Sequence, residues 1–288
     1  MARLIPTHGW IASARMYAVA PAAASTWHAL LLQLARRARV PLETVELPAP
    51  APIAQLWSHP RKGAVFMCGL PLARSRRPPC ILAAPVPAAA EFAGRAHYWS
   101  DFVVRAGSAH RSLEETLGGR IAFTSPESQS GFAAPLAHLR RLAAAPPLFR
   151  EVLAPQVTPQ GALSAVAEGR ADVAAIDAYS LLLLRRYAPE LVAQVRVVDR
   201  TQPRPIPPLV ASEPLPSLTR ALLTAHEDPD LQPALADLRL ARFVHAELDT
   251  YQLLAEEFRE ALAHWQAHHL ASLVHDAFAE LTPAQSAG

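Results

Sequence analysis

Cysteine is scarce in this sequence, and its two cysteines do not define a disulfide framework. Cys68 and Cys80 are the only ones among 288 residues, and each lies beside apolar residues. Small secreted domains that depend on disulfides carry many more. The two could form a disulfide, but a small buried thiol is the role that we expect for each.

Long apolar runs are absent too. No stretch reaches the ~18 residues that a transmembrane helix requires. The first 20 residues lack the apolar segment of a secretory signal, because Arg3, His8 and Arg15 are scattered through them. They read instead as the start of a first strand. We therefore expect a retained N-terminus and a cytoplasmic protein with reduced thiols; the alternative is a periplasmic protein whose export signal has been removed.

The sequence also lacks the motifs of the common catalytic and cofactor-binding sites. It has no Gly-x-Ser-x-Gly, no Walker loop, no His-Glu-x-x-His and no dinucleotide fingerprint. His264, His268 and His275 share one helical face, but no carboxylate or cysteine completes a metal-binding set. The net charge is only +2, with both signs mixed, which gives no case for nucleic acid. We expect no cofactor, no metal and no catalysis.

Apolar residues and prolines, by contrast, are plentiful. Half of the chain is hydrophobic (51%), and its length allows one large or two medium domains with real cores. The 28 prolines cluster at residues 48–52, 78–87, 203–208 and 214–216, where they separate elements rather than form a repeat.

Between these proline clusters, the periodicity of apolar residues predicts alternating strands and helices in two series. The first series has strands at 10–19, 42–47, 64–68 and 80–86, with helices at 25–39 and 53–58. The second has strands at 97–105, 121–123, 152–154, 172–176 and 195–199, with helices at 112–117, from 132, at 159–168 and at 181–187. Residues from 249 onward look purely helical. This order indicates parallel sheets with helices on both faces.

Residues 117–132 suggest an anion site. The short apolar run Ile121–Phe123 leads into a turn, and Ser128-Gln129-Ser130-Gly131 then opens a helical pattern. The first N–H groups of a helix lack acceptors within the helix, and the helix dipole favours negative charge there. Serine hydroxyls can donate to an anion, and Gly131 lets a ligand approach the backbone. An ordinary N-cap explains the same serines, so both interpretations stay open.

Five segments in sequential order resemble one known family. They are Cys68-Gly69-Leu70-Pro71, Tyr98–Arg105, Leu113–Arg120, Ser128–Gly131 and Val166–Asp177. Together they resemble the substrate-binding proteins of phosphate, phosphite and phosphonate ABC transporters (the PhnD-like group). The resemblance covers residues 10–245 and includes the family's Ser-Thr-Ser-Gly signature, with Gln129 in place of threonine.

The resemblance implies an α/β fold of the type II periplasmic-binding-protein kind, with two lobes that are each a mostly parallel sheet flanked by helices. Residues 1–95 and 201–248 would form lobe one, residues 96–200 lobe two, and residues 249–288 a helical tail. The segments 88–97 and 199–205 would act as the hinge. A small oxyanion or phosphonate-like ligand would bind between the lobes, and an ABC permease would be the partner.

The resemblance also assigns roles to residues. Ser128, Gln129, Ser130 and nearby amides would hold the oxygens of the ligand, with Gly131 beside them. Tyr98 would supply an aromatic hydroxyl, and Asp177 would meet an amino group or a protonated oxygen. Tyr17, after the first strand, is the first-lobe candidate. Packing roles remain open for both tyrosines, and Asp177 could be merely the buried end of a strand.

Two functional alternatives remain open. A cytosolic sensor or scavenger could use the same fold, and an enzyme could use Asp177 as a base in the same cleft. A homodimer through the C-terminal helices is a further option.

Overall fold

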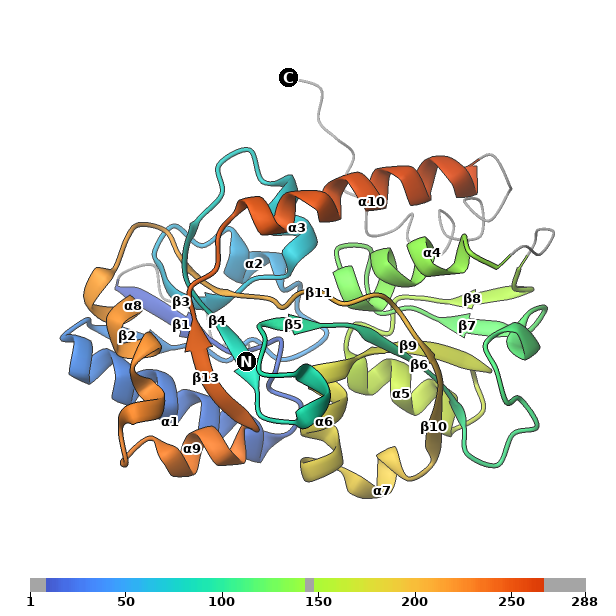
Figure 1. The fold of residues 1–288 in the computed structure, drawn as a ribbon, viewed down its shortest axis with the longest axis horizontal. Coiled ribbons are helices and arrows are strands. Elements are labelled where there is room, and N and C mark those ends of the chain that lie inside the picture. Colours follow the sequence, from blue (N-terminus) through green and yellow to red (C-terminus); the bar gives the residue numbers. More distant parts are fainter. Residues whose placement is uncertain (1–8, 143–147, 267–288) are drawn as a thin grey trace. The chain divides into compact units, whose positions relative to one another are not determined.

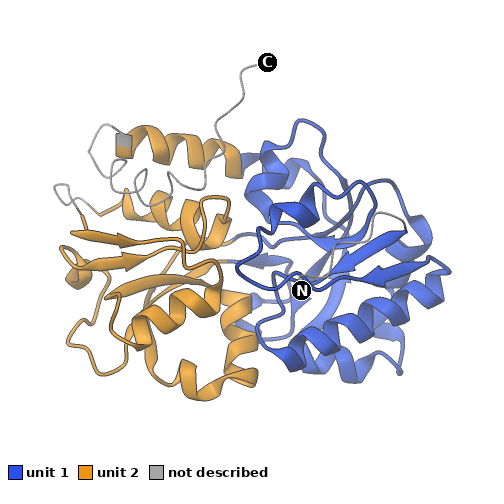
Figure 2. Ribbon diagram, turned by 180° about the vertical axis from the view of Figure 1, so that it is seen from behind, with its two compact units in different colours: residues 1–98, 204–253 blue, residues 99–203, 254–288 orange. Residues whose placement is uncertain are grey.

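The computed structural model describes residues 9–142 and 148–266. The chain falls into two compact units, shown in Figure 2. Unit 1 comprises residues 1–98 and 204–253, and unit 2 comprises residues 99–203 and 254–288. The chain thus passes from one unit to the other after Tyr98, after Pro203 and after Leu253. We call these three positions the crossings.

Unit 1 is built on a six-stranded sheet with the order β13-β4-β12-β3-β1-β2. Its strands are β1 (Trp10–Ser13), β2 (Leu42–Thr44), β3 (Lys62–Phe66), β4 (Cys80–Pro87), β12 (Leu209–Ala211) and β13 (Leu240–Val244). Its helices are α1 (Pro21–Ala38), α2 (Ala54–Trp57), α3 (Gly69–Arg74), η1 (Ala90–Phe92), α8 (Pro216–Leu223), η4 (Ala225–Glu227) and α9 (Gln232–Asp237). A small pair, β5 (His97–Tyr98) and β11 (Arg204–Pro205), adjoins the first two crossings.

Unit 2 is built on a five-stranded sheet with the order β10-β6-β9-β7-β8. Its strands are β6 (Ser100–Arg105), β7 (Arg120–Ala122), β8 (Glu151–Leu153), β9 (Val173–Asp177) and β10 (Val195–Arg200). Its helices are η2 (Glu114–Thr116), η3 (Gln129–Ala133), α4 (Ala134–Leu139), α5 (Pro159–Ala167), α6 (Ala178–Tyr187) and α7 (Pro189–Val192). In Figure 1, α4 lies on one face of this sheet, and α5, α6 and α7 lie on the other.

Apolar spacing explains where the helices pack. In α1, Trp27, Leu30, Leu31 and Leu34 repeat at helical spacing and are all buried. The helix ends because Arg39 adopts a left-handed conformation (φ 56°) and donates its N–H to Ala35 O and Arg36 O. The predicted helix at 25–39 is therefore confirmed, with its start four residues earlier, at Pro21.

The predicted α/β fold with helices around two sheets is confirmed, but the sheets are mixed rather than mostly parallel. In unit 1, β1 is parallel to β2 and β3, whereas β12 and β13 pair antiparallel. In unit 2, β7 is parallel to β8 and β9, whereas β6 and β10 pair antiparallel. The strands β6 and β12 come directly after crossings instead of following a crossover helix, so the βαβ rule does not set their direction. β10 follows α6 and α7 and runs parallel to β9, because both strands are antiparallel to β6.

The last helix, α10 (Asp249–Gln266), begins in unit 1 and ends in unit 2. Within unit 2, the Trp265 indole N–H donates to Leu136 O (3.0 Å), and Phe258 packs edge-on against Phe132 (5.9 Å between ring centroids). His264 lies in this helix, whereas His268 and His275 lie outside the described residues.

Both cysteines are free thiols in unit 1, as the sequence suggested; Cys68 is buried and Cys80 is half-buried.

Candidate functional site

The residues Ser128–Gly131, which we call the serine loop, form the start of a helix in unit 2. They follow β7, and η3 continues directly into α4. Ser128 is the N-cap of η3, and its Oγ accepts the Gly131 N–H (2.8 Å). Because this bond uses a lone pair of the Ser128 oxygen, the Ser128 O–H proton remains available to donate. The first turn of η3 is a π-helix, a geometry that is frequent at functional sites.

The other residues of the serine loop differ in exposure. Gln129 is buried (2% exposed), whereas Ser128 and Ser130 are half-buried. The Ser130 amide is among the first N–H groups of η3, which have no acceptor within the helix. The loop therefore presents two reachable hydroxyls and helix N–H groups, and all of these donors are neutral.

Position 131 requires a glycine, because the side chain of Thr124 leaves no room for a Cβ atom there. A Cβ built on Gly131 would lie 2.0 Å from Thr124 Oγ1, 2.8 Å from Cγ2 and 2.9 Å from Cβ. The Thr124 N–H also donates to Gly131 O (3.3 Å), and Thr124 O accepts the Val157 N–H (3.0 Å). Thr124 thus joins the serine loop to the turn between β8 and α5.

Asp177 ends β9 and is almost fully buried (4% exposed). Its carboxylate caps α6 by accepting the Ser180 N–H (2.5 Å). Burial raises the pKa of Asp177 to about 7, hydrogen bonds from Ser180 and Tyr179 oppose that rise, and the nearby Asp101 charge adds to it. Asp177 is thus the buried end of a strand and caps a helix, with a raised pKa, and its role toward a ligand stays a prediction.

Ser100 brings the serine loop and Asp177 together. It is fully buried (0% exposed), and its Oγ donates to Ser130 O (2.7 Å). In the pairing of β6 with β9, Ser100 is the cross-strand partner of Asp177. Ser100 lies within the motif Tyr98–Arg105, but nothing in the sequence pattern gives it a role, because its strand also contains the polar residues Asp101 and Arg105.

The two tyrosine candidates lie in unit 1 and are buried, each with 1% of its surface exposed. Tyr17 packs edge-on against Phe66 (5.0 Å between ring centroids), which is a core contact. Tyr98 is the last residue before the first crossing and pairs with Arg204 in the small sheet. The structure brings neither of them together with the serine loop inside one unit.

Two other motif residues of unit 2 form an ion pair that joins strands. Arg120 and Asp172 are bridged by N–H groups of the Arg120 guanidinium and backbone (2.8–3.2 Å). The Arg120 hydrogen bonds hold the pKa of Asp172 below its usual range. This pair fixes the start of β7 against the start of β9, so these residues of the Gly-Arg and Ala-Asp motifs are structural.

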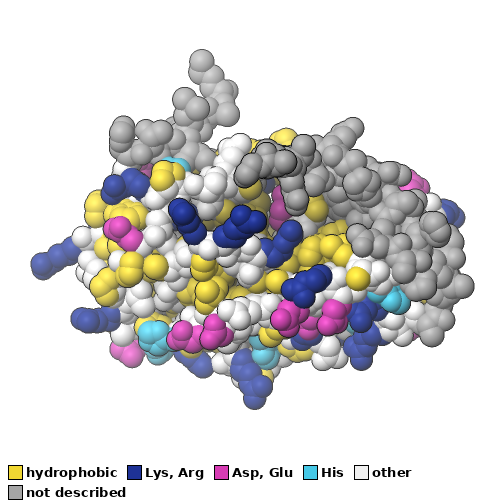
Figure 3. Space-filling view, turned by 90° about the horizontal axis from the view of Figure 1, so that it is seen from above, with side chains coloured by type: hydrophobic (Ala, Val, Ile, Leu, Met, Phe, Trp, Pro, Cys, Tyr) yellow, Lys and Arg dark blue, Asp and Glu magenta, His cyan; other side chains and the backbone are white. Residues whose placement is uncertain are grey.

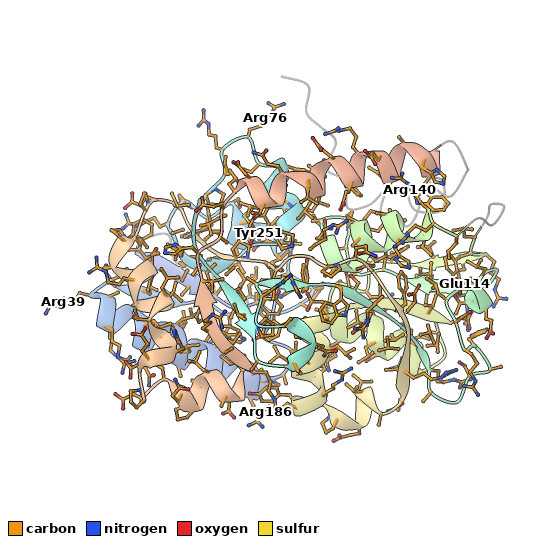
Figure 4. All side chains as sticks on the ribbon, viewed as in Figure 1. Arg39, Arg76, Glu114, Arg140, Arg186 and Tyr251 are labelled. Carbon is orange, nitrogen blue, oxygen red and sulfur yellow. The ribbon has the colours of Figure 1, made fainter. Side chains whose placement is uncertain are left out.

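Charge is spread without a basic patch on the face that Figure 3 shows, where arginine and acidic side chains are interspersed. Arg39, Arg76 and Arg186 are exposed and project away from the ribbon in Figure 4. Among the described residues, no group of three or more His, Cys, Asp or Glu side chains could hold a metal ion.

A hollow of about 550 Å³ lies in unit 1, apart from these polar groups. Cys80, Ile81 and Leu82 of β4 line it, together with residues of the loop before α8 and of α8 itself. Its walls are mostly apolar, and the charged or titratable Arg220 and His245 on its rim are exposed.

Comparison with known proteins decides the family. Residues 26–251 match the family model described as ABC transporter, phosphonate, periplasmic substrate-binding protein. The chain belongs to this family. Members of this family are binding components of transporters, so the chain is a binding protein and the enzyme alternative is not supported. No curated protein shows significant sequence similarity to it.

Solved structures confirm the fold of this family member. PhnD1 from Prochlorococcus marinus in complex with methylphosphonate matches with a TM-score of 0.74 and 16% identity, covering 88% of this chain and 98% of that one. A binding-protein component of an ABC phosphonate transporter from Pseudomonas aeruginosa matches with a TM-score of 0.70 and 17% identity, covering 95% and 99%. XAC2383 from Xanthomonas citri, bound to ATP, matches with a TM-score of 0.64 and 19% identity, covering 90% of this chain and 98% of that one.

Proposed function

We propose that this protein binds a small phosphonate or phosphate-like anion at the serine loop of unit 2 and delivers it to an ABC permease. The observation that carries the proposal is the Ser128–Gly131 hydrogen bond, which leaves the Ser128 O–H able to donate at a half-buried helix start. Membership of the family supports the transport role.

Neutral donors suit a protein that must release its ligand. The serine loop contains no arginine or lysine, so hydroxyl and amide groups would hold the anion without a matching charge. Hydrogen bonds to a charged ligand contribute about 1.5–3 kcal/mol each, enough for specific binding by a few donors. Asp177, beside the loop through Ser100, would repel a fully ionised ligand and favour one with a protonated oxygen or an ammonium group.

The remaining ligand residues of this proposal are less supported than the serines. Gln129 and Gly131 belong to the loop itself, and Gly131 keeps it close to Thr124. Tyr17 and Tyr98 would have to turn their hydroxyls toward the anion from unit 1, and the packing of Tyr17 on Phe66 argues against that role for it.

Removing the two reachable hydroxyls tests the site. We expect the double variant Ser128→Ala/Ser130→Ala to lose about 100-fold or more in affinity for methylphosphonate or phosphate, measured by calorimetric titration. The matched control is Ser25→Ala/Thr26→Ala, which removes two hydroxyls that bond back to Pro21 O and Ala22 O on α1. Equal affinities in the two double variants would reject the serine loop as the site.

Closure of the two units around the ligand, with the hinge at residues 88–97 and 199–205, remains a prediction. Small-angle scattering at saturating methylphosphonate should show a smaller radius of gyration than in the free protein. An unchanged profile would argue for binding by unit 2 alone.

The compartment is also part of the proposal. The family is periplasmic, and within the described residues no helix is long and apolar enough to cross a membrane. β1 lies between β2 and β3 in the sheet, so the mature protein must retain residues from Trp10 onward. A cytoplasmic location, with a sensing or scavenging role, is the finer hypothesis, which cell fractionation with N-terminal sequencing tests. Light scattering would test a homodimer through the C-terminal helices.

A further inference from the structure

Ser100 connects the serine loop to the chain segments next to two of the crossings, those after Tyr98 and after Pro203. We propose that Ser100 is a positioning residue for anion binding. It fixes the peptide group that aims the Ser128 hydroxyl, and it ties that group to the segments through which the chain leaves and re-enters unit 2. This inference rests on the proposed function for its ligand, but the link itself can be measured without one.

Every polar group of Ser100 is used. Its Oγ donates to Ser130 O (2.7 Å), its N–H donates to Thr201 Oγ1 (2.9 Å), and its carbonyl accepts the Thr201 N–H (2.9 Å). Ser100 and Thr201 are both buried, so water cannot replace these partners. Such a fully satisfied buried network specifies one arrangement of its members.

The bond to Ser130 O acts on the anion site through a rigid peptide plane. The C=O of Ser130 and the N–H of Gly131 belong to the same planar peptide group and point in opposite directions. Ser100 Oγ holds the carbonyl end of this group, and Ser128 Oγ holds the N–H end. If the carbonyl end is released, the plane can rotate, and the Ser128 oxygen then loses the bond that orients its hydroxyl.

The other bonds of Ser100 reach the crossings. Ser100 is the second residue after the crossing at Tyr98, and Thr201 lies two residues before the crossing at Pro203. The pair of bonds between them closes the base of the β6–β10 pairing, next to Arg200 and Asp101. A displacement of the serine loop on anion binding would therefore pull on both crossing segments through one side chain.

The first test uses the ligand-free protein and the variant Ser100→Ala. Hydrogen exchange should accelerate about tenfold at the Gly131 amide, which belongs to the same peptide group as the Ser130 carbonyl that Ser100 holds. Exchange should accelerate in residues 199–203 as well. The matched control is Ser13→Ala in unit 1, a buried serine whose Oγ also donates to a backbone carbonyl, Val45 O (3.0 Å). It should leave both segments unchanged.

The second test measures affinity for methylphosphonate by calorimetric titration. Ser100→Ala should weaken binding by about tenfold, whereas Ser13→Ala should change it by less than about twofold, even where both lower the melting temperature equally. Thr201→Val keeps the shape of the side chain and removes the acceptor of the Ser100 N–H, together with the longer bond from Thr201 Oγ1 to Gln202 O (3.4 Å). It should therefore accelerate exchange at residues 199–203 even if Ser100→Ala does not fold.

The outcomes separate the two proposals. If the parent protein binds no oxyanion but Ser100→Ala loosens both segments, the link stands and the proposed function is wrong. If the parent protein binds methylphosphonate and Ser100→Ala changes neither affinity nor exchange, the proposed function stands and the role of Ser100 is overturned.

Discussion

Each unit contains the same trio of parallel strands, but the helices that follow these strands begin differently. In unit 1 the trio is β3-β1-β2, followed by α3, α1 and α2; in unit 2 it is β9-β7-β8, followed by α6, η3 and α5. The three helices of unit 2 are capped by side chains of Asp177, Ser128 and Thr158. The N-cap residues of the three helices of unit 1 are Cys68, Ala20 and Ile53, and none of their side chains caps the helix.

This difference separates a polar edge from an apolar one. The carboxyl ends of parallel strands are where open α/β sheets bind ligands. In unit 2 that edge carries hydroxyls and a glycine, which suit an anion, and a buried carboxyl, which favours a ligand with a protonated oxygen or an ammonium group. In unit 1 the residues after β1 and β3 include Tyr17 and Cys68, which are buried. We therefore propose that unit 2 selects the charged group of the ligand, and four predictions test this division.

The largest effect should come from crowding the polar edge. Gly131→Ala would place a Cβ 2.0 Å from Thr124 Oγ1, so the serine loop must shift. We expect binding of methylphosphonate to fall below detection by calorimetry and stability to fall by about 1–3 kcal/mol. Gly107→Ala is the control, because a Cβ there meets nothing within 4 Å. Normal anion binding by Gly131→Ala would contradict the requirement for a close contact between residue 131 and Thr124.

The next effect concerns pH and Asp177. Its folded pKa of about 7 lies well above the ordinary value near 3.9. Between pH 4 and 7 the unfolded chain releases this proton and the folded chain retains it, so stability falls as pH rises through that window. Asp177→Asn keeps an oxygen for the cap and cannot ionise. In the parent protein we expect the free energy of unfolding, measured with urea, to fall by a few kcal/mol between pH 5 and pH 8. Asp177→Asn should remove this fall.

Asp172→Asn is the control for this experiment. Its pKa is lowered by Arg120, so its contribution is present above its unfolded pKa and is lost only as pH falls through the folded value. Its effect between pH 5 and pH 8 should be constant. A parallel pH dependence in the parent protein and Asp177→Asn would show that burial does not govern the Asp177 carboxyl.

A smaller effect should distinguish two caps within unit 2. Ser128 and Thr158 each accept a backbone N–H, from Gly131 (2.8 Å) and Gly161 (3.0 Å). Ser128→Ala and Thr158→Ala should each cost about 1 kcal/mol of unfolding free energy. Only Ser128→Ala should also weaken anion binding. Equal losses of affinity would place the ligand between the two helix starts rather than at η3.

The smallest effect should come from adding a side-chain N-cap to a helix of unit 1. Ala20 has an extended conformation at the N-cap of α1 and is only half-buried. Ala20→Asp should therefore add about 0.5–1 kcal/mol of stability without changing anion affinity. Ala29→Asp, exposed in the middle of the same helix, should be neutral or destabilising. Tighter anion binding by Ala20→Asp would mean that unit 1 contributes to charge selection.

Much of this architecture could be predicted from the sequence because its elements are separated by clear breaks. The strands at 42–47, 80–86 and 195–199 and the helix at 159–168 lie within a few residues of β2, β4, β10 and α5. Strand direction could not be predicted, because it depends on where the chain crosses between units. The helix α3 was not among the predicted helices, since Gly69 and Pro71 are typical turn residues, although proline is tolerated in the first turn of a helix.

The candidate site could be predicted in part for a similar reason. Ser128–Gly131 and Asp177 follow strands directly, so local pattern locates them. Ser100 and Thr201 contribute through bonds to residues 30 and 101 positions away in the chain, which no local pattern reveals. Tyr17 follows a strand too, but its burial against Phe66 depends on packing.

The distribution of the two thiols has a practical consequence for optical measurement. Both cysteines of the sequence belong to unit 1, and Cys68 is only 3% exposed, whereas Cys80 is half-buried. A maleimide dye should therefore attach at one place without any mutation. A second dye on a cysteine introduced at an exposed position of unit 2, such as Gly107, would then turn ligand-dependent movement into a change in energy transfer.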